Sequence, residues 1–233
     1  MSSISDNLTL EKAIEALEKV KAEFEIDNGR IAIITSDRYA ETYDIMGNHF
    51  TPDEPLSKAF GVTWNEEFEQ SVHKTLVQNV SICMISRDTN EVMGVRVIGL
   101  MRKSDPPSDF SSIKYEQLRS LYEFLNHKQY EVNFFERYEV DEAIHFTTLG
   151  VHKKFRRMGL GGRLLGAAVA MCRELGFKAI QGEGTSNFSQ RIYEKQGFET
   201  LITMPYDSYF YKGQPIINAT GEHTMTKIYG LKL

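Results

Sequence analysis

A basic loop between an apolar strand and a glycine-opened helix constrains this chain more than any other feature of its sequence. The strand ends in Leu149-Gly150-Val151, the loop reads His152-Lys153-Lys154-Phe155-Arg156-Arg157-Met158, and Gly159, Gly161 and Gly162 open the helix. The first backbone N–H groups of a helix lack intrahelical acceptors, and the helix dipole is positive at that end. Glycines let a ligand approach this backbone closely. The segment therefore predicts a binding site for a phosphate-bearing ligand.

Two common phosphate-binding motifs do not fit this loop. A Walker-type loop needs Gly-x-x-x-x-Gly-Lys-Ser/Thr, and the chain contains no such run. A dinucleotide fingerprint needs a third glycine, but Arg163-Leu164 follows Gly159-x-Gly161, and Asn187 stands where a third glycine after Gly182-x-Gly184 would belong. Nucleotide hydrolysis and hydride transfer are therefore disfavoured.

The loop does match a different pattern, Arg156-x-x-Gly159-x-Gly161, which resembles the acyl-CoA signature of the Gcn5-related N-acetyltransferase (GNAT) superfamily. Downstream, Ile192-Tyr193-Glu194-Lys195-Gln196-Gly197-Phe198 resembles the helix and following strand beyond the cofactor site in that superfamily. The structural alternative is a glycine-opened helix followed by an ordinary core tyrosine. The resemblance implies acetyl-CoA as co-substrate, bound by Leu149, Val151, Arg156, Arg157, Met158, Gly159, Gly161, Gly162, Arg163 and Asn187.

The same resemblance implies the α/β (α+β) GNAT fold. Its central mixed, mostly antiparallel sheet has about seven strands flanked by helices, and is splayed at strand 143–151. The residues alone agree, since strands alternate with helices in the second half, after a hairpin expected over 81–100. We expect an N-terminal amphipathic helical extension over residues 1–28 and a single N-acetyltransferase domain over 29–233.

Three further segments are similar to insect-type arylalkylamine (dopamine-type) N-acetyltransferases: Asp53-Glu54-Pro55-Leu56, Gly99-Leu100-Met101-Arg102-Lys103 and Thr185-Ser186-Asn187-Phe188-Ser189. This resemblance implies direct acetyl transfer to a primary amine in a ternary complex, with Glu54 as the general base. The family's paired serines fall on Thr185 and Ser189, with Ser186 between them, so the first of the pair is a threonine here. The structural alternative for Glu54 is a capping carboxylate before a helix.

Other candidate residues have two interpretations. Tyr193 matches the general acid of many superfamily members, but it also suits a packed core position. Ser186 and Ser189 are alternative proton donors. His145 is expected to be a satisfied core or cleft residue, and no histidine spacing predicts a metal site. Phe50, Phe60 and Trp64 suit either an arylamine pocket or the core.

Bulk properties set the remaining expectations. The net charge of −5 and isoelectric point near 5.7 disfavour nucleic-acid binding. The two cysteines are far apart, the N-terminus resembles no signal peptide, and no apolar run suits a bilayer, so we expect a cytoplasmic protein that is a monomer or weak dimer. Alternative acceptors are a polyamine, an amino acid or a protein amine, and the non-enzymatic alternative is a CoA-binding regulator.

Overall fold

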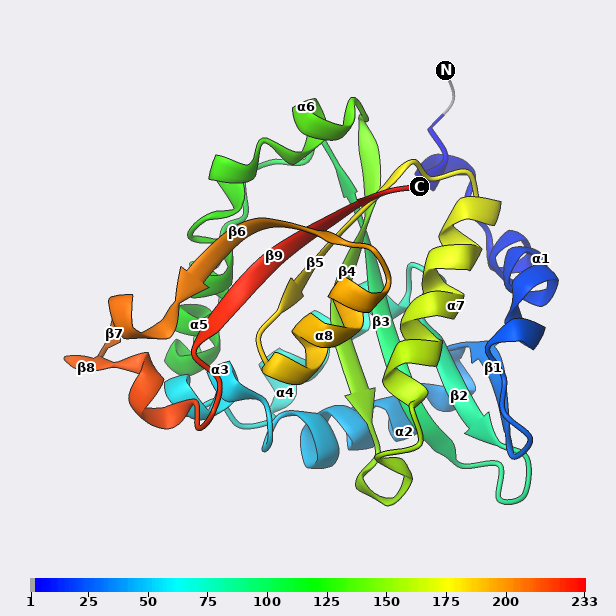
Figure 1. The fold of residues 1–233 in the computed structure, drawn as a ribbon, viewed down its shortest axis with the longest axis horizontal. Helices are drawn as coiled ribbons and strands as arrows, with labels where there is room; N and C mark the ends of the chain where they lie inside the picture. The colour runs from blue at the N-terminus through cyan, green and yellow to red at the C-terminus, as the bar shows by residue number, and fades with distance from the viewer. Residues whose placement is uncertain (1–2) are drawn as a thin grey trace.

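The structure is a computed structural model that describes residues 3–233. Its centre is a seven-stranded sheet in the order β1-β2-β3-β4-β5-β9-β6 (Figure 1). All neighbours pair antiparallel except β4 and β5, which are parallel. The strands are β1 (Gly29–Ile33), β2 (Ile82–Ser86), β3 (Val92–Arg102), β4 (Glu142–Val151), β5 (Ala179–Gly184), β6 (Glu199–Pro205) and β9 (Met225–Lys232), with a separate hairpin of β7 (Phe210–Tyr211) and β8 (Gln214–Pro215).

Helices cover both faces of this sheet. The α-helices are α1 (Leu10–Val20), α2 (Tyr39–Asp44), α3 (Pro55–Phe60), α4 (Glu66–Leu76), α5 (Glu116–Asn126), α6 (Phe134–Tyr138), α7 (Leu160–Glu174) and α8 (Asn187–Lys195). The shorter elements are the π-helix η4 (Ile45–Phe50) and the 3₁₀ helices η1 (Ser5–Asn7), η2 (Lys21–Glu23), η3 (Ser36–Arg38), η5 (Gln129–Val132), η6 (Lys153–Phe155), η7 (Tyr206–Ser208) and η8 (Ile216–Ala219). Within residues 3–233, none of these helices is long and apolar enough to cross a lipid bilayer.

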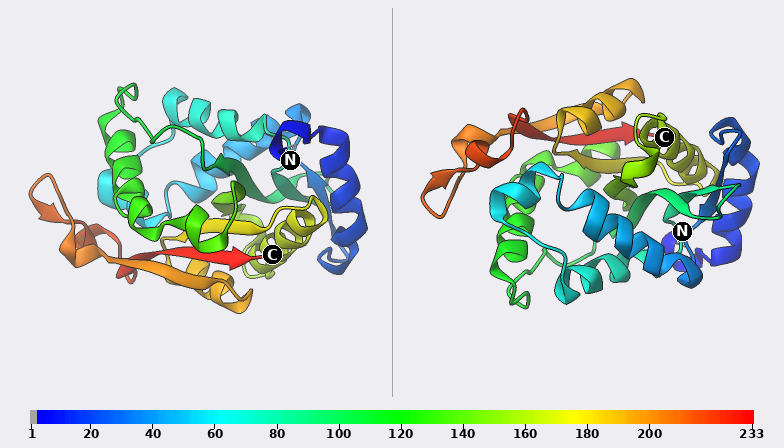
Figure 2. Two further views of the ribbon diagram at one scale, coloured as in Figure 1. Left: turned by 90° about the horizontal axis from the view of Figure 1, so that it is seen from above. Right: turned by 90° about the horizontal axis from the view of Figure 1, so that it is seen from below.

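Each face of the sheet has its own apolar core. Because side chains alternate along a strand, Ile144 of β4 joins the core beneath α1 and α7, whereas Ala143 joins the core beneath α3, α4 and α5. Figures 1 and 2 show α7, with α1 beyond it, on one side of the sheet and α3, α4 and α5 on the other. The β7–β8 hairpin projects from the edge near β6 (Figure 1).

The N-terminal helix α1 packs directly on α7. Its buried residues Ala13, Ala16 and Leu17 belong to the same core as Leu164 and Leu165. Thr9 caps the helix by accepting the N–H of Lys12. The expected helical extension is therefore present, while its division from the catalytic domain at residue 28 stays a prediction.

The sheet opens between β4 and β5. Their parallel pairing ends at Phe146 and Gly182, after which β4 continues to Val151 beside β3 alone. A register shift in the β3–β4 pairing passes over Thr147, whose Oγ1 donates to the carbonyl of Val97. This confirms the predicted fold and its splay at 143–151. The loop before α3 is short, because η4 extends through Phe50 and α3 begins at Pro55.

Candidate active site

The helix α7 begins with an open N-terminus. Gly159 is its N-cap residue, with a φ of 73°, and it offers no side-chain acceptor to the first-turn N–H groups. A Cβ added at Gly162 would meet nothing within 4 Å. Arg157 also lies in the left-handed region, at a φ of 66°. This backbone is therefore free to donate hydrogen bonds to an anion that lies against the helix end.

Most of the cationic side chains in the preceding loop have protein partners. Arg156 forms an ion pair with Asp53 at 2.7 Å and donates to the carbonyl of His49. Lys154 pairs with Glu91. Arg163 turns towards the N-terminal segment, where it donates to the carbonyls of Phe24 and Glu25. Among the described residues, Arg157 is the loop arginine without an ion pair, so its charge is available to a ligand.

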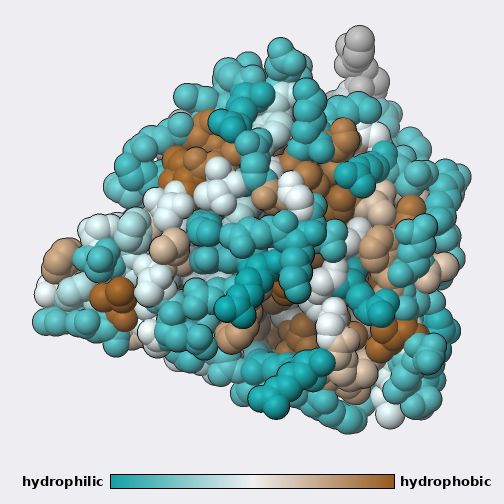
Figure 3. Space-filling model, in the orientation of Figure 1, coloured by the Kyte–Doolittle hydropathy of each residue, from teal (hydrophilic) through white to brown (hydrophobic). Residues whose placement is uncertain are grey.

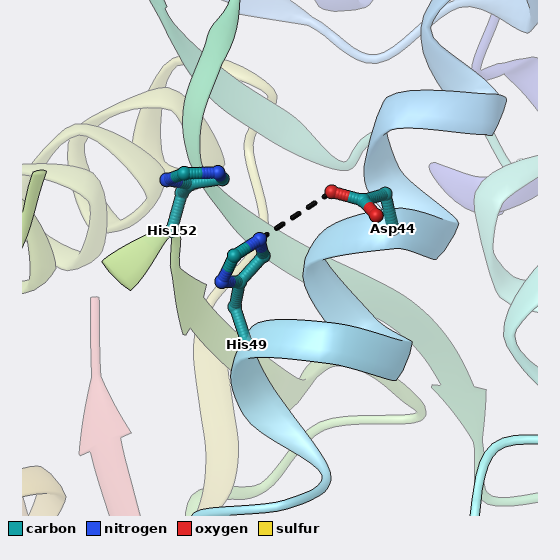
Figure 4. A group of neighbouring side chains, drawn as sticks. All are labelled: Asp44, His49 and His152. Atoms are coloured by element: carbon teal, nitrogen blue, oxygen red, sulfur yellow. Dashed lines mark ion pairs between the residues drawn. The ribbon is translucent and has the colours of Figure 1, made fainter. Parts of the chain in front are cut away.

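Two histidines accept hydrogen bonds from the backbone of this loop. His49 Nδ1 accepts the N–H of Lys153, and His152 Nδ1 accepts the N–H of Lys154. Their rings lie 3.8 Å apart, and His49 Nε2 faces Asp44 at 3.4 Å (Figure 4). These three residues form the metal-compatible group that tertiary folding assembles among the described residues. Because each Nδ1 accepts a backbone N–H, the proton of each neutral ring is on Nε2, and a metal ion would have to displace it.

A cavity of about 1620 Å³ runs from the end of α7 through the opening between β4 and β5. The molecular face in Figure 3 is hollowed near its middle, with apolar groups lying deeper than a hydrophilic rim. The predicted site residues that line the cavity are Glu54, Leu149, Val151, Arg156, Arg157, Gly159, Gly161, Gly162, Ser186, Ser189 and Tyr193. Met158, Arg163 and Asn187 do not line it. The amide of Asn187 donates instead to the carbonyl of Glu222.

Glu54 is the N-cap residue of α3. Its two carboxylate oxygens accept the backbone N–H groups of Leu56 and Ser57. The side chain is buried with 8% of the residue exposed, and it still faces the cavity. The structure thus combines the two interpretations of Glu54, since a capping carboxylate also lies in the cavity wall.

The serines at the start of α8 cap that helix. Ser186 Oγ accepts the N–H of Ser189, and Ser189 Oγ accepts the N–H of Ser186, which completes a capping box. Their hydroxyl oxygens are 3.0 Å apart. The carbonyl of Thr185 accepts a hydrogen bond from Tyr206. Thr185, Ser186 and Ser189 all line the cavity, so their hydroxyl groups are near the opening between the strands.

Tyr193 points from α8 to the end of the β4–β5 pairing. It is 2% exposed, and its hydroxyl accepts a hydrogen bond of 2.7 Å from Arg96 Nη2 on β3. The ring stacks on Tyr229 at 4.9 Å. Burial raises the pKa of Tyr193, and the nearby Arg96 opposes this rise. Tyr193 is thus buried like a core residue and also faces the cavity through a polar contact.

A histidine–glutamate pair lies on the other side of the same opening. His145 Nε2 is 3.0 Å and 2.9 Å from the two carboxylate oxygens of Glu183, and Gln129 also donates to this carboxylate. Burial disfavours the charged imidazolium, but Glu183 outweighs it and raises the pKa of His145. His145 is a satisfied cleft residue, as expected. The sequence did not lead us to Glu183, the partner of His145, or to Arg96. Each is a charged residue inside a buried strand, and that unusual position is the signal that could have revealed them.

The three aromatic residues with two interpretations divide between the cavity and the core. Phe50 lines the cavity, but Phe60 and Trp64 do not. Phe60 packs in the core against Phe124, and the ring of Trp64 lies 4.9 Å from that of Phe68 in a tilted arrangement. For these two the core interpretation holds, because both rings pack against neighbouring helices. The aromatic side chains that line the cavity are Phe50, Phe68, Phe110, Tyr122, Phe134, Phe135, Phe155, Phe188 and Tyr193.

Residues 122–200 match the family model of the acetyltransferase (GNAT) domain. The chain therefore contains an acetyltransferase (GNAT) domain. The matched region contains β4, the basic loop, α7, β5 and α8, which together form the open helix end and the strand opening described above. The chain is an acyltransferase whose acyl donor is acetyl-CoA.

Solved structures share the fold over most of this chain. The arylalkylamine N-acetyltransferase 2 of Aedes aegypti is 27% identical, with a TM-score of 0.82 over 88% of this chain and 99% of that one. A mosquito arylalkylamine N-acetyltransferase like 5b is 21% identical, with a TM-score of 0.79 over 88% and 100%. The Drosophila melanogaster polyamine N-acetyltransferase, which forms N-acetylagmatine, is 18% identical, with a TM-score of 0.78 over 88% and 100%. At their identities, the last two bear on the fold alone.

Proposed function

We propose that this GNAT acetyltransferase acetylates the primary amine of an arylalkylamine by direct transfer in a ternary complex. The observation that carries this proposal is one continuous cavity, lined at one end by the open N-terminus of α7 and elsewhere by aromatic side chains. Its volume of about 1620 Å³ exceeds the roughly 300–1,000 Å³ of a site for one small ligand, so it suits two substrates at once. The mosquito arylalkylamine N-acetyltransferase at 27% identity supports this acceptor class.

The residues at the α7 end fit the diphosphate of acetyl-CoA. The first-turn N–H groups, the unpaired Arg157 and the open space at Gly162 provide donors, charge and room for close approach. When bound, acetyl-CoA supplies an activated acetyl group. Within residues 3–233, the side of β4 that faces away from β3 has no neighbouring strand beyond Phe146. Its backbone N–H groups are placed to stabilise negative charge on the acetyl oxygen.

The acceptor must lose a proton before it can attack. An alkylammonium group has a pKa near 10, like that of lysine, so it is almost wholly protonated at neutral pH. We assign Glu54 as the proton acceptor, acting directly or through a water molecule. Its burial in the cavity wall and the two backbone N–H groups that hold its carboxylate in place support this role. The proton of the departing thiol comes from Tyr193, Ser186 or Ser189, which lie around the same opening.

An acceptor panel tests the proposed substrate class. The enzyme would be incubated with acetyl-CoA and tyramine, spermidine, agmatine, an amino acid or a peptide, and released CoA would be measured. Preference for tyramine in kcat/KM is expected, because the cavity wall is aromatic. Preference for spermidine, agmatine or the peptide would reject the arylalkylamine assignment and retain the transferase. CoA binding without release in the presence of any amine would instead indicate a regulator.

We infer that the enzyme works in the cytoplasm as a monomer or weak dimer, with small molecules as its partners. The acidic isoelectric point near 5.7 supports small-molecule over nucleic-acid partners. Sedimentation of the purified chain would test the oligomeric state.

A further inference from the structure

Arg96 places a permanent positive charge inside the sheet. The residue is 2% exposed, and within residues 3–233 no carboxylate lies within ion-pairing distance of its guanidinium. Its buried Nε has no hydrogen-bond partner among these residues. Arginine does not lose its proton in proteins, so it cannot avoid the cost of burial by becoming neutral. A charge held at this cost is expected where the charge has a function.

The position of Arg96 relates it to the reaction. Its guanidinium lies 4.1 Å above the ring of Phe146, the last β4 residue paired with β5. One of its nitrogens, Nη2, donates to the hydroxyl of Tyr193. That hydroxyl lies against Gly182, the partner of Phe146 on β5. Arg96 and Tyr193 therefore meet at the point where β4 and β5 separate, and Arg96 also lines the cavity.

The direction of this hydrogen bond leaves the phenol proton available. Tyr193 oxygen accepts from Arg96, and no acceptor for its own hydrogen is found among the described residues. A hydroxyl group carries one donor and two acceptor sites, so the hydrogen can point into the opening. The guanidinium thus holds the oxygen in place and leaves the hydrogen free to be donated into the cavity.

We propose that Arg96 is a positioning residue that aims Tyr193 at the departing sulfur and stabilises the phenolate after proton transfer. This inference rests on the proposed function, in which Tyr193 is one of three candidate proton donors. In the step, the acyl carbon–sulfur bond breaks and its electron pair stays on sulfur. The proton of Tyr193 passes to that sulfur and gives the free thiol, while the O–H electron pair stays on the phenolate beside Arg96. The amine releases protons as the amide forms, and one of them restores the phenol.

The groups around Tyr193 favour its neutral, protonated form before the reaction. Burial raises the pKa of Tyr193, so the phenol keeps its proton until a base forms beside it. Glu183 on β5 acts in the same direction, and Arg96 on β3 is the group that opposes it. From the other packed elements, Tyr229 on β9 stacks on the ring, and the thiol of Cys172 on α7 lies near Arg96 with a raised pKa. Arg96 is thus the positive charge that stabilises the phenolate.

A double-mutant cycle tests the inference. Arg96→Met, Arg96→Lys, Tyr193→Phe and both double variants would be compared in kcat, with CoA affinity by calorimetry as a check on the fold. Tyr193→Phe is expected to lower kcat roughly 100-fold. Arg96→Met should lower kcat roughly tenfold to 100-fold in the wild type. In the Tyr193→Phe background it should change kcat by less than about twofold, because Arg96 acts through the hydroxyl that is already gone.

A spectroscopic readout separates this role from simple packing. The ¹³Cζ NMR signal of Tyr193, identified by its loss in Tyr193→Phe, would be followed as pH is raised from neutral. In Arg96→Met the phenol should ionise at higher pH than in the wild type. If Arg96→Met does not fold, Arg96→Lys serves in the same cycle, because a lysine keeps the charge but lacks the planar fork.

The role of Tyr193 and the role of Arg96 are contradicted by different results. Wild-type kcat in Tyr193→Phe would remove Tyr193 as the donor, and with it this inference, while Ser186 and Ser189 would remain. A slow Tyr193→Phe enzyme with an equal Arg96 effect in both backgrounds and an unchanged Tyr193 titration would overturn the role of Arg96 alone.

Discussion

The hydroxyl group of Tyr193 lies directly against the backbone of Gly182. A Cβ built on Gly182 would overlap the hydroxyl oxygen and come within 2.9 Å of Tyr193 Cζ. These residues belong to α8 and β5, and they meet where the pairing of β4 and β5 ends. A glycine at this place therefore lets a buried phenol reach the opening in which acetyl transfer is proposed.

The variant Gly182→Ala is expected to displace Tyr193. The methyl group forces the ring out of its contact with Arg96, which should lower kcat and cost about 1–3 kcal/mol of unfolding free energy, as overpacking does. Steady-state kinetics and chemical denaturation would measure the two effects. Gly99→Ala is the matched control on β3, because its nearest contact would be an ordinary 3.5 Å. Equal behaviour of the two variants would contradict the steric role of Gly182.

The variant Glu54→Gln separates capping from proton transfer. Glutamine keeps one of the two acceptor oxygens, so weakening of the cap should cost at most about 1 kcal/mol of stability. Loss of the base should lower kcat roughly 100- to 10,000-fold at neutral pH. Affinity for acetyl-CoA should change little, since the Glu54 carboxylate bonds the backbone of α3 and not the basic loop. Asn65→Ala, which removes the corresponding cap of α4, should reproduce only the stability loss.

His145 provides the competing explanation for the base. If Glu54→Gln kept its kcat while His145→Gln lost it, the proton acceptor would be His145. The pH profile of kcat/KM in each variant would show which residue sets the acidic limb.

The pair of His145 and Glu183 should make stability depend on pH in a defined window. The pKa of His145 is raised, so its contribution is complete below the unfolded value of 6.5 and is lost as pH rises through the folded value. Glu183, whose pKa is lowered despite its burial, contributes above 4.5 and loses this as pH falls through its folded value. The pair therefore stabilises the fold most between 4.5 and 6.5.

Chemical denaturation of the wild type and Glu183→Gln would test that window. The stability difference between them should shrink by the order of 1 kcal/mol from about pH 5.5 to about pH 8. Glu131→Gln, which breaks only an exposed pair with Lys128, should change stability by less than about 0.5 kcal/mol at both pH values. A constant difference for Glu183→Gln would show that the pair is not ionised as proposed.

The variant Gly161→Asp should abolish CoA binding. A Cβ there would press on Ile192 at 3.0 Å and Leu149 at 3.4 Å, and the carboxylate would occupy the helix end proposed for the diphosphate. The fold should survive, since an acid near a helix N-terminus is favourable by about 0.3–1 kcal/mol. Calorimetry with CoA measures the loss, and Gly161→Ala separates bulk from charge. Unchanged affinity in Gly161→Asp would remove the diphosphate assignment at this loop.

The sequence by itself determined the open helix end of the site and the fold around it. The strand, basic loop and helix that include Arg156, Gly159 and Gly161 are consecutive, so their relation is local and visible in a linear pattern. A helix N-terminus has free N–H groups wherever the helix lies, which makes this physical argument independent of packing. The alternation of apolar residues likewise predicted strands, whereas the splay followed from the resemblance to the superfamily.

Tertiary structure alone decided the other side of the site. Arg96 and Tyr193 are 97 positions apart, and His145 and Glu183 are 38 apart, so their contacts depend on sheet order and register. The same holds for Phe60 and Trp64, whose rings suited either pocket or core until the neighbouring helices were placed. Charges buried on different strands leave no spacing signal, because a strand shows only which face each residue occupies.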